Sequence, residues 1–266
     1  MLRRWCIPLA ILALALAPAL AAGSASAATP QGHATTVRTG GPMQHVTGSG
    51  TALAAHGGIR NEAESTNWSG YAVDGGTYTS VSASWVQPAG RCTSATRYSS
   101  FWVGLDGYSS DSVEQDGTDT DCVDGSPQYY GWYETYPNPS YSFGDTVKAG
   151  DHISASVVYE GSDEFKLTLA DSTQNWSVST TQTVSGAALS SAEVIIEAPC
   201  CTNSGGVLPL ADFGTVNVSD SVVDGEAIGD LSPVQIIMVD NSGNDKDTVS
   251  SLSSEENFSA TWVRAN

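Results

Sequence analysis

Three glutamates are the first candidates for chemistry in this chain. Glu197 ends the apolar run Val194-Ile195-Ile196, and a glutamate buried at such a place would have a raised pKa that suits acid or base catalysis. Glu193 lies four residues earlier, and therefore on the same face of an extended strand. Glu134 lies within an aromatic segment, residues 129–136. For Glu197 and Glu134 the composition leaves a second interpretation open, a strand end exposed to solvent.

Histidine usage excludes several kinds of catalytic site. The chain has four histidines, and after residue 60 it has only His152. A Ser-His or Cys-His pair would need that residue, and a zinc site of the HExxH kind needs two. Because His152 begins a predicted strand beside Asp151, we expect a solvent-exposed strand end.

Two acid-rich segments, 116–121 and 240–247, are possible calcium ligands. Neither matches an EF-hand loop. We therefore expect solvated acidic turns, and neither a metal nor another cofactor.

The charge balance limits the partners. The formal net charge is −19, and residues 61–266 contain all 29 acidic but only six basic residues, a charge of −23. Phosphate groups and anionic lipid headgroups would be repelled by such a surface. We therefore expect no nucleic-acid partner and no membrane association.

The N-terminal segment has the pattern of a secretory signal peptide. Arg3 and Arg4 precede an apolar run over residues 7–22, and Ala25-Ser26-Ala27 fits the small-residue cleavage pattern. The run is short for a spanning helix. We predict a signal peptide over residues 1–27 and a secreted, extracellular protein.

Residues 28–60 differ in charge from the rest of the chain. They contain no acidic residue, two arginines and three of the four histidines. A weakly basic segment ahead of a strongly acidic body favours a propeptide held by charge. A plain linker is the alternative. We predict a propeptide over 28–60 and one catalytic domain over 61–266.

Four cysteines remain after the signal peptide, namely Cys92, Cys122, Cys200 and Cys201. An even number in a secreted protein predicts two disulfides. Three pairings are possible, and the sequence leaves all three open.

The body of the chain has the pattern of an all-β protein. Alternating or apolar segments separated by Asp-Gly and Ser-Gly turns predict strands near residues 78–86, 99–105, 129–136, 151–159, 165–169, 176–180, 193–197, 234–239 and 258–263. No segment has a convincing helical pattern. We predict two packed antiparallel sheets, a β-sandwich of the jelly-roll kind.

Several short motifs, in order, resemble those of the glutamic peptidases, the eqolisin family of acid endopeptidases. They are Asn67-Trp68-Ser69-Gly70, Phe101-Trp102-Val103-Gly104-Leu105-Asp106-Gly107, Val113-Glu114-Gln115-Asp116-Gly117-Thr118-Asp119, Trp132-Tyr133-Glu134-Thr135-Tyr136-Pro137, Ala192-Glu193-Val194-Ile195-Ile196-Glu197 and Leu210-Ala211-Asp212-Phe213. The resemblance implies a two-sheet sandwich in a secreted, propeptide-bearing protease without metal. It implies protein or peptide substrates, and we expect a monomer that binds its own propeptide.

The resemblance also implies the site residues. Gln115 and Glu197 become the catalytic pair, and the substrate-binding residues become Trp68, Gly70, Trp102, Asp106, Gly107, Gly117, Asp119, Glu134 and Tyr136. There are three departures from the family pattern: Tyr130, where fungal members often have Asp; Ala198-Pro199, in place of an acidic-aromatic pair; and the Cys200-Cys201 doublet. They bear on substrate preference and disulfide pattern.

The chemistry of such a pair is coherent. A glutamate can take a proton from water as it attacks a peptide carbonyl, and can return it to the leaving amine. A glutamine amide, helped by a backbone N–H such as that of Gly70, can donate a hydrogen bond to the oxyanion. Two alternatives remain: a secreted jelly-roll glycosidase using Glu134 and Glu197, and a non-catalytic carbohydrate-binding module.

Overall fold

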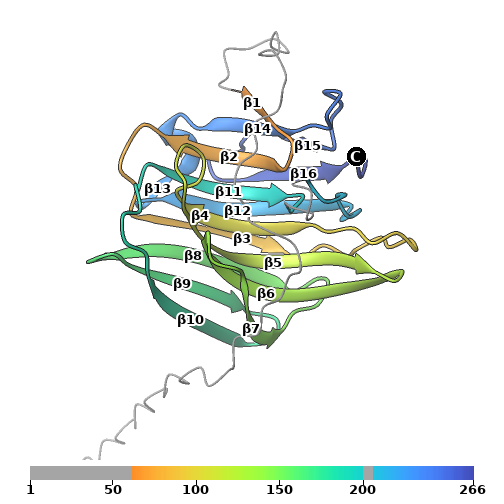
Figure 1. The fold of residues 1–266 in the computed structure, drawn as a ribbon, viewed down its shortest axis with the longest axis horizontal. Coiled ribbons are helices and arrows are strands. Elements are labelled where there is room, and N and C mark those ends of the chain that lie inside the picture. Colours follow the sequence, from red (N-terminus) through yellow and green to blue (C-terminus); the bar gives the residue numbers. More distant parts are fainter. Residues whose placement is uncertain (1–61, 200–205) are drawn as a thin grey trace, which may run out of the picture. The chain divides into compact units, whose positions relative to one another are not determined.

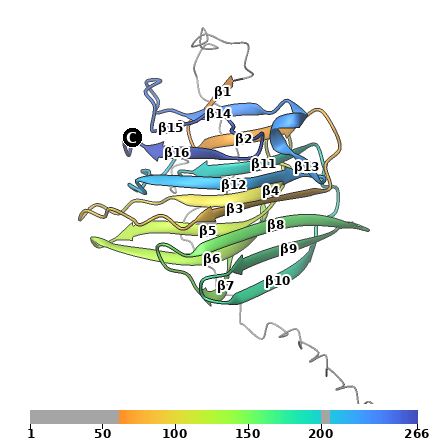
Figure 2. The ribbon, with the colours of Figure 1, turned by 180° about the vertical axis from the view of Figure 1, so that it is seen from behind.

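The computed structural model describes residues 62–199 and 206–266. Within these residues the chain forms sixteen strands and one short 3-10 helix, η1 (Ile228–Leu231). The strands make two sheets that pack against each other (Figures 1 and 2). The predicted all-β sandwich is therefore confirmed. In this part of the chain no helix has the length and apolar character needed to span a bilayer.

The first sheet contains the strands that carry most of the predicted site residues. In spatial order they are β1 (Glu62–Ser65), β14 (Val234–Met238), β2 (Trp68–Asp74), β11 (Ser191–Glu197), β4 (Ser100–Leu105), β5 (Val113–Val123), β6 (Ser126–Tyr136) and β7 (Tyr141–Thr146). The pairing of β1 with β14 is parallel, and all other pairs in this sheet are antiparallel.

The second sheet backs the first. In spatial order it contains β10 (Trp176–Thr183), β9 (Glu164–Asp171), β8 (His152–Gly161), β3 (Ser80–Val86), β12 (Thr215–Val223), β16 (Phe258–Trp262) and β15 (Asp247–Val249), with β13 (Glu226–Ala227) paired to β12. His152 is exposed at the start of β8, as predicted.

Side-chain alternation builds the core between the sheets. On β8 the buried Ile153, Ala155 and Val157 alternate with more exposed residues, as expected for a sheet with one solvated face. The strands β4 and β11 are buried on both faces. Their sequences therefore read as continuous apolar runs rather than as alternation. Side chains therefore pack on both faces of the first sheet at β4 and β11, whereas β8 of the second sheet has one solvated face.

A second apolar cluster lies on the face of the first sheet that points away from the core. Its members are Trp68, Ala72, Trp102, Val113, Trp132, Ile195 and Ile236. All are almost fully buried. Three tryptophans gathered on one face therefore make this side of the sheet apolar and buried rather than solvated.

The hairpin of β5 and β6 corrects one expectation from the sequence. Residues 116–121 were predicted as a solvated acidic turn, but they lie within β5 and are almost fully buried. The turn is Asp124-Gly125, with φ angles of 50° and 78°. Two residues of positive φ make the tight turn that matches the twist of a hairpin. This turn sets the register that places Gln115 opposite Glu134.

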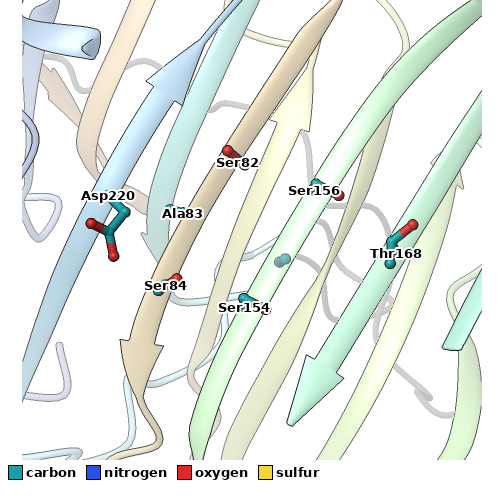
Figure 3. A pocket seen from close by; sticks show the side chains of 8 residues that line it. Ser82, Ala83, Ser84, Ser154, Ser156, Thr168 and Asp220 are labelled. Atoms are coloured by element: carbon teal, nitrogen blue, oxygen red, sulfur yellow. The ribbon is translucent and has the colours of Figure 1, made fainter. Parts of the chain in front are cut away.

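The outer face of the second sheet is polar and shallowly grooved. A groove of about 270 Å³ lies on this face. Figure 3 shows the hydroxyl side chains from β3, β8 and β9 that line it, with Asp220 at its side. The lining residues with hydroxyl groups are Ser82, Ser84, Ser154, Ser156 and Thr168. Small polar side chains at alternate positions are what a solvated sheet face requires.

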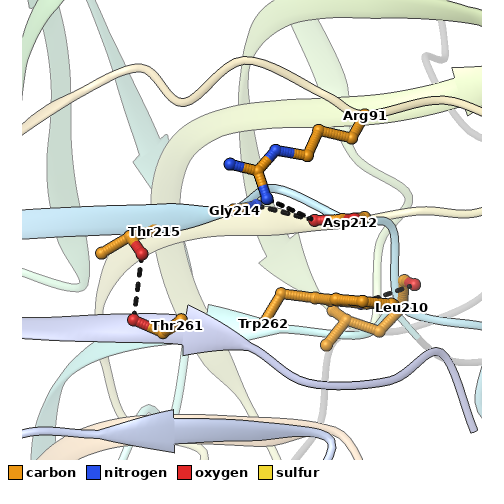
Figure 4. Close-up of polar contacts among 7 residues, drawn as sticks. All are labelled: Arg91, Leu210, Asp212, Gly214, Thr215, Thr261 and Trp262. Atoms are coloured by element: carbon orange, nitrogen blue, oxygen red, sulfur yellow. Dashed lines mark hydrogen bonds and ion pairs between the residues drawn. The ribbon is translucent and has the colours of Figure 1, made fainter.

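The segment before β12 is tied to the second sheet by polar contacts (Figure 4). The Trp262 indole N–H donates to the Leu210 carbonyl at 3.3 Å, and the backbone N–H of Gly214 donates to Asp212 at 3.0 Å. Arg91 lies 4.0 Å from Asp212, but its side chain is 73% exposed. Such an exposed ion pair adds little stability. The indole and backbone contacts therefore hold this segment.

One disulfide joins Cys92 to Cys122, with the sulfurs 2.02 Å apart. Of the three pairings left open by the sequence, only one contains this bridge. Cys200 and Cys201 lie outside the described residues, so their pairing stays a prediction. The predicted signal peptide and propeptide also lie outside the described residues.

Candidate active site

Cross-strand register places most of the predicted site residues on one face of the first sheet. Three adjacent rows cross β2, β11, β4, β5 and β6: Trp68, Glu197, Ser100, Asp119 and Tyr130; then Gly70, Ile195, Trp102, Gly117 and Trp132; then Ala72, Glu193, Gly104, Gln115 and Glu134. Gln115 and Glu197 therefore share a face, and the row containing Trp102 lies between them.

The Glu197 carboxylate is held by two N–H donors. The Trp102 indole Nε1 donates to Oε2 at 2.9 Å, and the Asn67 amide Nδ2 donates to Oε1 at 3.3 Å. All three side chains are buried. Hydrogen bonds donated to a carboxylate favour its charged form. The arrangement can therefore hold Glu197 ready to accept a proton.

Asn67 is positioned by the turn that joins β1 to β2. The Ser65 hydroxyl donates to Asn67 Oδ1 at 3.0 Å and accepts the backbone N–H of Trp68 at 3.1 Å. The backbone carbonyl of Asn67 accepts the N–H of Ala198 at 2.8 Å, directly after Glu197. In the sequence, the only feature that points to Asn67 is its place in the motif with Trp68.

Gln115 is fixed by its cross-strand neighbour. Its amide Nε2 donates to Glu134 Oε2 at 2.8 Å, and both side chains are almost fully buried. An amide nitrogen carries two hydrogens. The bond to Glu134 uses one of them and orients the group, so the second hydrogen remains for a ligand.

Two of the predicted glycines shape the sheet. A Cβ on Gly117 would lie 2.1 Å from the Phe101 carbonyl oxygen, and one on Gly70 would lie 2.3 Å from the Val194 carbonyl oxygen. Gly70 also has a φ of 128°, which a residue with a Cβ rarely adopts. Both positions therefore require glycine for the close strand approach that brings Trp102 beside its neighbours.

Asp119 accepts hydrogen bonds from two aromatic side chains. Trp132 Nε1 donates to its Oδ1 at 2.6 Å, and the Tyr130 hydroxyl lies 2.7 Å from its Oδ2. The same hydroxyl lies 2.6 Å from Asp121 Oδ2. Tyr130 thus supplies a phenol between two carboxyl groups.

A family model decides the identity of the chain. The model of the Peptidase A4 family matches residues 66–262. The chain belongs to the Peptidase A4 family. It is a glutamic endopeptidase, and the predicted resemblance is confirmed.

Solved structures of glutamic peptidases share the fold. Scytalido-glutamic peptidase with a transition state analog inhibitor is 28% identical, with a TM-score of 0.66 over 74% of this chain and 98% of that chain. SCP-B of the eqolisin family, in complex with the tripeptide Ala-Ile-His, is 26% identical, with a TM-score of 0.61 over the same two shares, 74% and 98%.

Aspergilloglutamic peptidase from Aspergillus niger is 26% identical, with a TM-score of 0.55 over 63% of this chain and 99% of that chain. No curated protein sequence matches the chain. Scytalido-glutamic peptidase is also solved with a peptide based transition state analog, at 27% identity to this chain. These structures give no support to a glycosidase or to a carbohydrate-binding module.

Asp106 does not contact Glu197 or its two donors, but holds a loop of the peptidase beside them. It accepts the backbone N–H groups of Leu189 at 2.7 Å and Ser190 at 2.9 Å, and the Ser110 hydroxyl at 3.1 Å. These bonds fix the loop after β4 to the segment before β11. A Cβ on Gly107 would lie 3.3 Å from the Trp68 ring, so this loop folds onto the tryptophan. Asp106 therefore fixes the loop that lies against Trp68.

Tyr136 lies at the end of β6, opposite Val113. It packs against the cluster of three tryptophans. Its ring therefore borders the same face of the peptidase as the predicted catalytic pair.

Several buried acids of the peptidase have raised pKa values. Burial raises the pKa of Glu193 well above its ordinary value, and the nearby Asp106 and Glu114 carboxylates add to the effect. Burial, with Asp106, raises the pKa of Glu114 to about 8. Burial also raises the pKa of Asp116, whose side chain faces Thr168 of the second sheet. In acid these groups are neutral, so their burial is tolerated.

A metal site is not evident in the described part of the peptidase. No group of three or more His, Cys, Asp or Glu side chains there could hold an ion.

Proposed function

We propose that this peptidase is a secreted acid endopeptidase whose Glu197 is the general base and whose Gln115 stabilises the oxyanion. The observation that carries the proposal is that Glu197 and Gln115, on one sheet face, have opposite hydrogen-bonding roles. The Glu197 carboxylate receives two N–H donors. The Gln115 amide donates once, to Glu134, and keeps a second hydrogen.

The first chemical step follows from these roles. Glu197 takes a proton from a water molecule as the water attacks the peptide carbonyl carbon. The carbonyl oxygen gains negative charge, and the second N–H of Gln115 donates a hydrogen bond to it. Losing one such donor typically costs about a hundredfold to a thousandfold in kcat.

The second step breaks the peptide bond. Glu197, now protonated, gives the proton to the leaving amine nitrogen, and the carboxylate is restored for the next cycle. A single glutamate can therefore serve both steps. This division of labour fits a domain whose one histidine, His152, is exposed at a strand end of the other sheet.

Secretion and zymogen formation are part of the proposal. The signal pattern of residues 1–27 and the acid-free segment 28–60 support them. The disulfide between Cys92 and Cys122 is a further support, since disulfides persist in oxidising compartments. We propose that the enzyme acts as a monomer and is inhibited by its own propeptide until it meets acid.

A digestion experiment tests the activity. Denatured haemoglobin or casein is incubated with the purified enzyme from about pH 2 to 7, with and without pepstatin or EDTA. We expect internal cleavage that is strongest in acid and unaffected by EDTA. Activity confined to neutral pH, or abolished by EDTA, would refute an acid peptidase that uses only glutamate and glutamine.

A further inference from the structure

Lys246 is a buried cation at the Glu197 end of the first sheet. Its side chain is 3% exposed. The backbone N–H donates to the Met238 carbonyl at 2.8 Å, and the carbonyl accepts the Val263 N–H at 2.9 Å. These bonds fix the lysine between the ends of β14 and β16. Burying a lysine is costly unless its charge is paired or used.

The Lys246 ammonium points to the turn that positions Glu197. Nζ donates to the Thr66 carbonyl at 3.2 Å. Thr66 directly precedes Asn67, whose amide donates to the Glu197 carboxylate at 3.3 Å. The ammonium and the Glu197 carboxylate attract each other through space. The Lys246 ammonium therefore contacts the residue next to Asn67, one of the two donors that hold the Glu197 carboxylate.

We propose that Lys246 is a positioning residue for the peptidase reaction, whose buried positive charge keeps the Glu197 carboxylate ionised in acid. The inference rests on the role of Glu197 proposed above. A carboxylate that must accept a proton has to lose its own proton at the working pH, and a nearby fixed cation favours that state.

The state of Lys246 itself fits this role. Burial lowers its pKa to about 8, while the charges of Asp247, Asp240 and Glu197 oppose that change. Throughout the acid range the amine therefore stays protonated, and its charge does not vary where the enzyme works.

The acids near Lys246 differ in their charge in acid. Asp247 is fully buried, accepts the Ser69 hydroxyl at 2.5 Å, and has a pKa raised by burial to about 7. It is therefore neutral in acid. Asp240, in the β14–β15 loop, attracts the lysine and stays ionised further into acid, because hydrogen bonds from Asn244 lower its pKa. It therefore offsets part of the charge of Lys246. Asp245 in the same loop and Arg264 after β16 are exposed to solvent.

Three further acids share the sheet face of Glu197, namely Asp119, Glu193 and Glu134. Burial raises the pKa of Glu193 and keeps it neutral in acid, and Glu134 accepts the Gln115 amide. Asp119 lies in the same cross-strand row, beyond Ser100, and is occupied by Trp132 and Tyr130. A negative charge there would disfavour ionisation of Glu197. Lys246 acts in the opposite sense, so its removal should move the balance toward the protonated acid.

A structural role for Lys246 is the competing explanation. The bond from Nζ to Thr66 could serve only to hold the β1–β2 turn. Loss of such an anchor would lower stability or kcat at every pH. It would not move the pH at which activity rises from the acid side. A shift of that pH therefore distinguishes the electrostatic role from a purely structural one.

The test is the acid limb of the profile of kcat/KM against pH for cleavage of a peptide substrate. Lys246→Met should move the limb to higher pH by about one pH unit, the size expected for one charge at short range in a protein. Lys246→Arg should restore it. Lys166→Met removes the same charge from an exposed site on β9 and should leave the limb in place.

Two additions keep the test decisive. If Lys246→Met does not fold, Lys246→Gln retains a donor for Thr66 without the charge. Titration of ¹³C-labelled glutamate, with Glu197 assigned by its loss in Glu197→Gln, reads the ionisation of Glu197 without needing activity.

An unmoved limb and an unmoved Glu197 titration in both neutral variants would overturn the inference for Lys246. Full activity of Glu197→Gln would instead overturn the proposed function. The two failures are therefore distinguishable.

Discussion

Trp102 donates its indole N–H to the carboxylate of Glu197, with 2.9 Å between Nε1 and Oε2. The two residues lie on neighbouring strands, β4 and β11, in adjacent rows of the register. The Trp68 ring meets the Trp102 ring edge-on, with centroids 4.9 Å apart. One aromatic side chain therefore both fills the face between the proposed catalytic residues and orients one of them.

Trp102→Phe removes this N–H and keeps an aromatic ring. Because a hydrogen bond to a charged group contributes about 1.5–3 kcal/mol, we expect kcat/KM to fall by about tenfold to a hundredfold. Trp262→Phe is the matched control, since the indole of Trp262, on β16 of the other sheet, donates to the Leu210 carbonyl in the segment before β12. Steady-state cleavage of a peptide at acid pH measures both. Equal losses in the two variants would show that the indole bond to Glu197 has no special role.

Gln115→Ala removes the proposed oxyanion donor. We expect kcat to fall by about a hundredfold or more while KM changes little. Gln235→Ala is the control, because it truncates a mostly buried amide on β14 that donates to Val249. Circular dichroism establishes that both variants fold. Retention of more than about a tenth of wild-type kcat in folded Gln115→Ala would reject its role.

The buried acids predict that stability falls as pH rises. Glu114 and Asp247 have folded-state pKa values raised to about 8 and about 7, and those of Glu193 and Asp116 are also raised. The folded state therefore binds more protons than the unfolded state above about pH 4, and stability present in acid is lost through about pH 7 to 8. The negative charge of residues 61–266 adds repulsion.

Thermal unfolding measured from about pH 3 to 8 tests this, with Tm expected to fall across the range. Glu114→Gln should reduce the fall, because it removes one group that must ionise in a buried place. A Tm that is constant or rises toward neutral pH would contradict the prediction.

The segment 28–60 predicts inhibition that depends on pH. Its histidines gain charge below about pH 6.5, while the carboxylates of the body lose theirs near pH 4, so attraction should peak at about pH 5–6. Inhibition of the purified enzyme by a synthetic 28–60 peptide, measured from about pH 3 to 7, tests this. Inhibition that is strongest at pH 3, or absent throughout, would leave the segment as a linker.

The strands with regular patterns were predictable, and the strand that carries Gln115 was not. The alternation around Ile153 and the apolar run before Glu197 both indicate the strands that form. By contrast, β5 buries polar residues such as Gln115 and Asp116 on both faces. A buried strand with so many polar residues has the composition of a turn. The sequence pattern therefore predicts a turn where the structure has a strand.

The hydrogen bonds that position Glu197 could not be predicted from the sequence pattern either. Asn67 binds Glu197 across 130 positions of sequence, and Lys246 reaches the same turn across 180 positions. Such contacts depend on the order of strands in the sheet, which local spacing does not encode. The motifs identified by resemblance assigned roles to Gln115 and Glu197, but gave no role to Asn67 or Lys246.

The kcat of Glu197→Gln compared with that of Glu193→Gln tests the central claim most directly. The two glutamates lie on the same face of β11, and both are fully buried. Because the raised pKa of Glu193 keeps it neutral in acid, a glutamine there is a close substitute, and kcat should stay near wild type. Glu197→Gln removes the base, and kcat should fall by about a hundredfold or more. Near-normal kcat in folded Glu197→Gln, or an equal loss in Glu193→Gln, would contradict the assignment of Glu197 as the base.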